Sequence, residues 1–220
     1  GGSDGRNFPK LEQLNLSNNG LEPSHITALV PFLESRSILR RLNFDNTGLN
    51  GEGARVLSGA LDHVRIDGLS LNDNFIDDDG VASLLSAQNA RYLTELRLDD
   101  NDGIGVTGYN SISQFLKRDD TELVTLAVST VDVDIAKMLV DSVSNKSKLS
   151  CLDIRLHNRS TARAVVPDIQ SLVCNTTNFE SLCASNHRLH NFGLALHLGL
   201  AGSYTNLKKA LEINARHHLS

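Results

Sequence analysis

The sequence predicts an α/β solenoid, a curved stack of strand–helix units with a parallel sheet inside and helices outside. Three observations lead to this fold class. An apolar pattern of eleven residues recurs seven times, its copies begin 26 to 30 residues apart, and the segments between copies have the spacing of amphipathic helices. A unit of this size cannot bury both its strand and its helix alone, so neighbouring units must stack.

The copies share one arrangement of apolar and turn residues. The first, LEQLNLSNNGL at residues 11–21, has leucine at places 1, 4, 6 and 11 and asparagine at place 9. The seven copies begin at Leu11, Leu39, Ile66, Leu93, Leu123, Leu149 and Phe179. Place 9 holds Asn19, Thr47, Asn74, Asn101, Val131, His157 and His187. A distorted eighth copy begins near Leu207, so the pattern predicts a leucine-rich-repeat solenoid, or horseshoe, of seven to eight repeats.

Each part of a copy predicts a local structure. Apolar residues at places 4 and 6 indicate a short strand with one buried face. An asparagine at place 9 is expected to bond the backbone where the chain leaves the strand. Helical patterns follow at 51–61, 80–85, 112–116, 135–143 and 164–173. Pro31 and Pro167 fall inside predicted helices, which they should shorten or kink.

No segment has the composition of a linker, so we expect residues 1–220 to form one domain. Residues 1–7 are expected to be a tag remnant or disordered, and residues 207–220 a degenerate C-terminal repeat or cap. Only Phe8 and Pro9 offer apolar cover for the first repeat. The N-terminal end is therefore expected to fray, or to be covered by a preceding segment or by a second copy in a homodimer.

The repeat resembles the ribonuclease-inhibitor-like class of leucine-rich repeats over about residues 8–215, with LNGEGARVLSGAL at 49–61 similar to that class's helix entry. The resemblance implies a horseshoe and a cytoplasmic protein that binds other proteins. The chain departs from the class at Val131, His157 and His187, where the turns and the curvature of the C-terminal half are expected to differ.

Composition argues against several functions. The chain has 26 acidic and 21 basic residues, which disfavours nucleic acid as a partner. It has no apolar run of the roughly 18 residues that a membrane helix needs. Its cysteines, Cys151, Cys174 and Cys183, are too few and too scattered for a disulfide framework, which favours the cytoplasm. No catalytic or cofactor motif occurs, and the acidic stretches at 75–80 and 98–103 lack the ligand order of a calcium loop, so no catalytic, cofactor or metal site is expected.

Side chains at places 3, 5, 7 and 8 should face out of the inner sheet. From these places we select eight residues as candidates for partner binding: Asp45, Asp73, Glu95, Arg97, Asp99, Asp100, Asp153 and Arg155. Asp77, Asp78, Asp79 and Asp102 lie in the loops just beyond. The acids of copies two to four and these loops would form an acidic lip, either a dock for a basic patch on the partner or a solvated rim.

The sequence therefore predicts a non-catalytic protein–protein interaction module that binds a partner through its concave face and its acidic strand-exit loops. Two alternatives remain open. The first is a regulator of a small GTPase, of the GTPase-activating type, because the Ran GTPase-activating proteins have the repeat class that this chain resembles. The second is an architectural segment of a longer receptor or effector.

Overall fold

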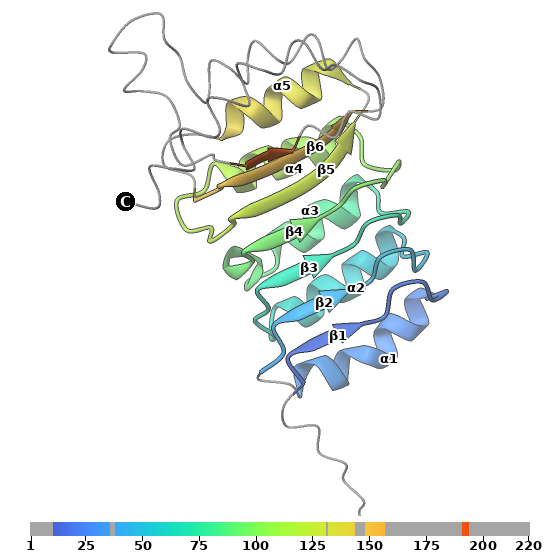
Figure 1. The fold of residues 1–220 in the computed structure, drawn as a ribbon. Coiled ribbons are helices and arrows are strands. Elements are labelled where there is room, and N and C mark those ends of the chain that lie inside the picture. The colour runs from blue at the N-terminus through green and yellow to red at the C-terminus, as the bar shows by residue number, and fades with distance from the viewer. Residues whose placement is uncertain (1–10, 36–37, 131, 144–147, 157–190, 194–220) are drawn as a thin grey trace, which may run out of the picture.

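The computed structural model describes residues 11–35, 38–130, 132–143, 148–156 and 191–193. In this part of the chain a parallel sheet of seven strands follows the chain order β1 to β7, and helices cover one of its faces (Figure 1). The strands are β1 (Gln13–Asn15), β2 (Arg41–Asn43), β3 (Gly68–Ser70), β4 (Glu95–Arg97), β5 (Thr125–Thr130), β6 (Cys151–Leu156) and β7 (Asn191–Gly193). This α/β arrangement, with a parallel sheet on one side and helices on the other, is the predicted fold class.

One helix follows each of the first five strands. These are α1 (Pro23–Glu34), α2 (Gly51–Leu61), α3 (Asp78–Ser86), α4 (Val106–Leu116) and α5 (Val133–Ser142), and a 3-10 helix, η1 (Ala90–Tyr92), precedes β4. Helix α1 continues through Pro31 to Glu34, so Pro31 does not shorten it. None of the helices in the described ranges combines the length and the apolar character that crossing a membrane requires. The predicted helix at 164–173, with Pro167, lies outside the described residues.

The pairing of the strands confirms the register of six copies. Place 3 of each copy lies beside place 3 of the next, in the row Gln13, Arg41, Gly68, Glu95, Thr125 and Cys151. Beyond the sixth copy, the strand that pairs with Cys151 begins at Asn191, whereas the predicted seventh copy has Ser181 at place 3. Leu182 and Phe192 are both apolar residues able to occupy the middle of a short strand, so leucine spacing alone does not separate the two segments. Residues 181–183 lie outside the described part of the chain.

A single hydrophobic core runs along the stack from Ile26 to Ile154. In the second copy, Leu39, Leu42 and Phe44 at places 1, 4 and 6 are at most 2% exposed. Helix α2 contributes Ala54, Leu57, Ala60 and Leu61, which are also buried. The strand and helix of each unit thus share one apolar layer, as the stacking argument requires.

Two buried asparagines at place 9, Asn74 and Asn101, join their turns to the preceding repeat. The side chain of Asn74 is 3% exposed, and its amide nitrogen donates to the carbonyl oxygens of Phe44 (2.8 Å) and Leu71 (3.0 Å). Its oxygen accepts from the backbone N–H groups of Thr47 (3.1 Å) and Leu49 (2.9 Å). One side chain thereby closes its own turn and satisfies buried backbone groups of the repeat before it.

Asn101 makes three of these four contacts one repeat later. It donates to Leu71 O at 2.9 Å and Leu98 O at 3.1 Å, and accepts from Ile76 N–H at 3.1 Å. These bonds confirm the role predicted for the asparagine at place 9.

The ends of the strands change after the fourth copy, whereas Val131, His157 and His187, where the sequence departs from the class, lie outside the described residues. At place 8, Asn18, Asn46, Asp73 and Asp100 have positive φ angles between 51° and 59°. Short polar side chains tolerate this left-handed conformation, whereas β-branched threonine does not. Copy five has Thr130 at this place, and β5 and β6 run for six residues where β1 to β4 run for three.

Helix α4 is capped by a side chain from the preceding repeat. Its own N-cap residue, Gly105, has no side chain to offer. Instead, Asp78 Oδ1 accepts from the backbone N–H groups of Gly105 (2.6 Å) and Gly108 (2.9 Å). A Cβ on Gly108 would lie 2.7 Å from that oxygen, so glycine is required for the carboxylate to reach the helix end.

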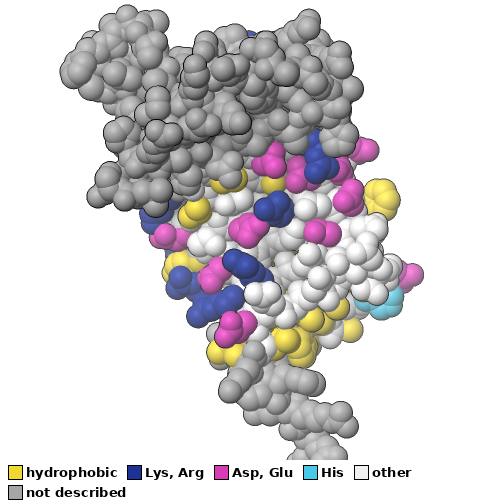
Figure 2. All heavy atoms as spheres, viewed as in Figure 1, with side chains coloured by type: hydrophobic (Ala, Val, Ile, Leu, Met, Phe, Trp, Pro, Cys, Tyr) yellow, Lys and Arg dark blue, Asp and Glu magenta, His cyan; other side chains and the backbone are white. Residues whose placement is uncertain are grey.

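The first repeat is less well covered than the second. Leu11, Leu14, Leu16 and Leu21 are only partly buried, whereas their counterparts in the second copy are in the core. Hydrophobic side chains gather at this end of the molecule in Figure 2. The exposed apolar surface is where the sequence predicts fraying or a homodimer contact.

We expect the backbone amides of residues 13–17 to exchange with solvent faster than those of residues 68–72, because β1 pairs with β2 alone among the described strands and its leucines are only partly buried. Hydrogen–deuterium exchange at two protein concentrations measures this. Protection of residues 13–17 that rises with concentration would indicate a homodimer through this end. Equal protection of both segments at low concentration would show that the first repeat needs no further cover.

Candidate protein-binding face

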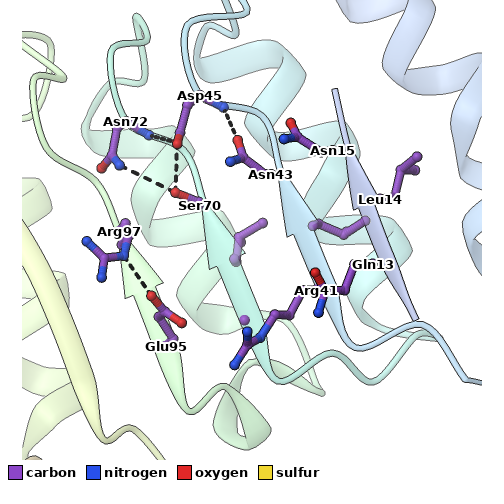
Figure 3. Close-up of a pocket in the computed structure, with 13 residues that line it drawn as sticks. Gln13, Leu14, Asn15, Arg41, Asn43, Asp45, Ser70, Asn72, Glu95 and Arg97 are labelled. Atoms are coloured by element: carbon purple, nitrogen blue, oxygen red, sulfur yellow. Dashed lines mark hydrogen bonds and ion pairs between the residues drawn. The ribbon is translucent and has the colours of Figure 1, made fainter. Parts of the chain in front are cut away.

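The face of the sheet that the helices do not cover carries the side chains at places 3 and 5. We call it the open face. Over β1 to β4 it is hollowed by about 380 Å³, and Figure 3 shows the lining side chains. The polar side chains that line this strand-face hollow are Gln13, Asn15, Arg41, Asn43, Asp45, Ser70, Asn72, Glu95 and Arg97. Basic and acidic side chains are interspersed over the strands of this face (Figure 2).

Two of the predicted candidates, Glu95 and Arg97, project side by side from β4. Arg97 Nε donates to Glu95 Oε1 at 2.6 Å, and both side chains are partly exposed. This hydrogen bond raises the pKa of Arg97, with a further contribution from the negative charges of the nearby acids. The pair presents both charges to solvent while each largely satisfies the other.

Asp45 is held by the neighbouring repeat. Its Oδ1 accepts from Ser70 Oγ at 2.7 Å and from the backbone N–H of Asn72 at 2.8 Å. The carboxylate therefore ties the turn after β2 to β3, and its first role is to fix the edge of the hollow.

Four further candidates form a charge cluster with Arg97 across β5. Arg97 and Asp153 stand on either side of the buried Ala127, in one register row of β4, β5 and β6. The small side chain of Ala127 leaves room above the sheet, and the Arg155 guanidinium donates to Asp100. We call Arg97, Asp99, Asp100, Asp153 and Arg155 the cross-strand cluster.

Two carboxylates of the cross-strand cluster are incompletely satisfied. Asp99 is 5% exposed, and one buried oxygen each of Asp99 and Asp153 lacks a hydrogen-bond partner among the described residues. Burial raises the pKa of Asp99 to about 6, against the opposing charge of Arg155. Burial also raises the pKa of Asp153. Both groups therefore hold their protons more tightly than an exposed carboxyl.

The acids of the predicted lip differ in exposure and in role. Asp77 caps α3 by accepting from Gly80 N–H at 2.8 Å. Asp78 caps α4, Asp45 and Asp100 accept hydrogen bonds from other residues of the protein, and Asp99 is buried. Asp73, Asp79 and Asp102 are exposed. We call these three residues the acidic edge.

The eight candidates do not include the residues best placed to donate hydrogen bonds, Asn15, Arg41 and Asn43. The sequence contained a signal for Arg41. In the register that the leucines predict, it lies next to Gly68, which has no side chain to cover it. The Cγ atom of Arg41 lies 3.2 Å from the position that a Cβ on Gly68 would occupy, so the arginine extends across β3.

Metal and thiol chemistry gain no support within the described ranges. No three His, Cys, Asp or Glu side chains there gather closely enough to hold a metal ion. Cys151 is a free, half-buried thiol on the open face, and burial raises its pKa. A raised pKa lowers the thiolate fraction, so this cysteine is a weak nucleophile.

Comparison with known proteins supports the fold. No protein-family model matches the chain. A tropomodulin C-terminal domain from Caenorhabditis elegans matches with a TM-score of 0.52 and 15% identity, over 62% of this chain and 84% of that domain. The leiomodin-1 domain named actin-binding site 2 matches with a TM-score of 0.54 and 18% identity, over 62% of this chain and 80% of that domain. Likeness at such low identity shows the fold alone.

These structures correct the family that the sequence analysis named. The expected specific resemblance to the ribonuclease-inhibitor-like class is wrong, because the chain matches solved structures of tropomodulin and leiomodin domains. The leucine pattern predicts which residues face the core and where the turn after each strand lies. Solenoids with one strand and one helix per repeat share those requirements, so the pattern does not separate their classes. The chain is similar in fold to the C-terminal domain of tropomodulin and to the actin-binding site 2 domain of leiomodin-1.

Proposed function

We propose that this chain is a non-catalytic protein-binding module that holds its partner on the open face. The observation that carries the proposal is the strand-face hollow, where polar side chains of four neighbouring strands face solvent together. Rigid, twisted sheets position such side chains without a large entropic cost on binding. The free thiol of Cys151 also fits an intracellular protein, which is the location we propose.

Actin is the first partner to test. The leiomodin-1 domain that matches this chain is named as an actin-binding site, and the match covers most of that domain. A fold shared at 18% identity does not carry a partner with it, so this proposal depends on direct measurement.

We further propose that the acidic edge guides a partner with a basic patch. Exposed carboxylates attract opposite charge over a Debye length of about 8 Å at physiological salt. Asp73, Asp79 and Asp102 are exposed, so they act through solvent, whereas Asp45 and Asp99 shape the face from within. The partner's orientation would then be fixed by the remaining charged candidates, which are Glu95, Arg97, Asp100, Asp153 and Arg155.

Site-specific photocross-linking tests the face. We expect a benzophenone side chain at Asn43, on the open face, to cross-link purified actin, and the same group at Arg55, on the exposed side of α2, to give no product. The yield from Asn43 should fall as the ionic strength rises, because the acidic edge contributes to encounter. Equal cross-linking from both positions would rule out the open face. With no product from actin, the same pair of variants in the source cell identifies the partner and its face.

A further inference from the structure

Two asparagines of the strand-face hollow have their oxygens occupied and their amide nitrogens unused. Asn15 Oδ1 accepts from Ser17 N–H at 2.9 Å, and Asn43 Oδ1 accepts from Asp45 N–H at 2.7 Å. Each bond fixes the side chain in the turn after its strand. Within the described residues the two NH₂ groups have no acceptor, so both asparagines present donors to the hollow.

Arg41 adds a charged donor to the same hollow. Its neighbours' carboxylates are engaged, because Glu95 pairs with Arg97 and Asp45 accepts from Ser70 and Asn72. Among the described residues the Arg41 guanidinium has no ion pair or hydrogen bond of its own. Figure 3 shows it extended from β2 toward β4 without an interaction line. The absence of a side chain on Gly68 allows this position.

These groups need acceptors. A guanidinium presents paired N–H groups that match a carboxylate, and amide NH₂ groups match peptide carbonyl oxygens. Asn15 and Asn43 lie in register on adjacent strands, about 4.8 Å apart. Arg41 lies two residues before Asn43 on the same face of β2. The donors therefore form an extended row and not a single point.

We infer that the strand-face hollow binds an acidic, extended segment of the partner protein, with a carboxylate on Arg41 and backbone carbonyls on Asn15 and Asn43. This inference rests on the proposed function of the open face. It names a short peptide and not a polyanion, because the chain has a net charge of −5 and the acidic edge would repel a long run of phosphates. The partner would then bring acidic residues to the hollow and basic residues to the acidic edge.

NMR titration of the ¹⁵N-labelled full chain tests the inference. The probe is a synthetic nonapeptide with two central glutamates flanked by glycine and serine, and its counterpart has glutamine at both positions. We expect the glutamate peptide to shift the Arg41 Nε–Hε signal, the Asn15 and Asn43 NH₂ signals and the Gly68 amide in a saturable way. The glutamine peptide should bind about tenfold more weakly, since it lacks the charged acceptor.

Two arginine variants of equal charge provide the control. Arg41→Gln should weaken binding of the glutamate peptide about tenfold. Arg40→Gln removes the same charge from the adjacent residue, whose guanidinium lies 3.9 Å from the Asp67 carboxylate and outside the hollow, and should leave the affinity unchanged. Both arginines are exposed, so both variants should retain the wild-type spectrum elsewhere.

Three results would overturn the inference. The first is equal affinity for the two peptides, and the second is an equal loss of affinity in the two arginine variants. The third is a shift of the same signals by inorganic phosphate but not by the glutamate peptide, which would indicate a simple anion site. Cross-linking from Asn43 that persists in Arg41→Gln would then show that the open face holds its partner without an acidic segment. Absence of the Asn43 cross-link even when Arg40 and Arg41 are both present would count against the proposed function itself.

Discussion

Replacing Asn74 by alanine should lower the free energy of unfolding by about 3 kcal/mol. The substitution removes donors to Phe44 and Leu71 and an acceptor for Thr47 and Leu49, and it leaves these backbone groups buried. An unsatisfied buried polar group costs about 1–3 kcal/mol, and water can enter the small cavity to satisfy part of the set. Urea unfolding followed by circular dichroism measures the loss.

Asn19→Ala is the matched control. Asn19 occupies the same place in the first copy, but it is exposed and donates only within its own turn, to Leu16 O at 2.8 Å and Ser17 O at 3.1 Å. We expect this variant to lose less than about 1 kcal/mol, because water replaces its bonds. Similar losses in both variants would mean that the contacts between repeats add nothing beyond closing a turn.

Replacing Asp99 by asparagine should stabilise the protein at neutral pH and have no effect on stability near pH 4. The pKa of Asp99 is raised from 3.8 to about 6, mainly by burial. Between these values the folded protein keeps a proton that the unfolded chain has lost, so the stability from this group is present below pH 3.8 and is lost as the pH rises through about 6. At pH 7 the variant should be more stable by about 2 kcal/mol.

The difference in unfolding free energy between Asp99→Asn and the wild type, measured from pH 4 to pH 7.5, isolates this group. The raised pKa of Asp153 has the same sign and is present in both proteins, so it largely cancels. A difference that is flat across this range, or one that is largest at pH 4, would contradict the assignment. The residual pH dependence of the variant then reports Asp153 and the remaining acids.

The sequence was enough to predict the strand register of six copies and the role of Asn74. Both follow from local requirements, since apolar residues at places 4 and 6 must face one core and a short amide must satisfy the turn. The seventh strand was not predictable in this way. After Leu149 the asparagine at place 9 is absent, and Phe192 is as acceptable beside Leu152 as Leu182 would be.

The candidate site was harder to predict than the fold, because the partners of charged side chains lie in other repeats. Asp45 and Asp100 are both acids at the exit of a strand, at places 7 and 8. Asp45 accepts from Ser70 and Asn72, whereas Asp100 pairs with Arg155, two strands away. Only the register row through Ala127 brings Arg97 and Asp153 near each other. The number of acidic residues in each copy therefore predicts the net charge at the edge of the sheet. It does not predict which carboxylates are free to contact a partner.

The contact from Asp78 to helix α4 has a consequence for how such a protein can be shortened or lengthened. The residue that caps α4 belongs to the preceding repeat. The repeat defined by the sequence period is therefore not the same segment as the set of residues that stabilise one helix. Excising one unit between two strands would join α4 to a residue chosen for a different neighbour. A deletion or duplication is better tolerated when the residues corresponding to Asp78 and Gly108 are kept together. The segment to transfer as one piece therefore runs from the loop before one helix to the start of the next helix.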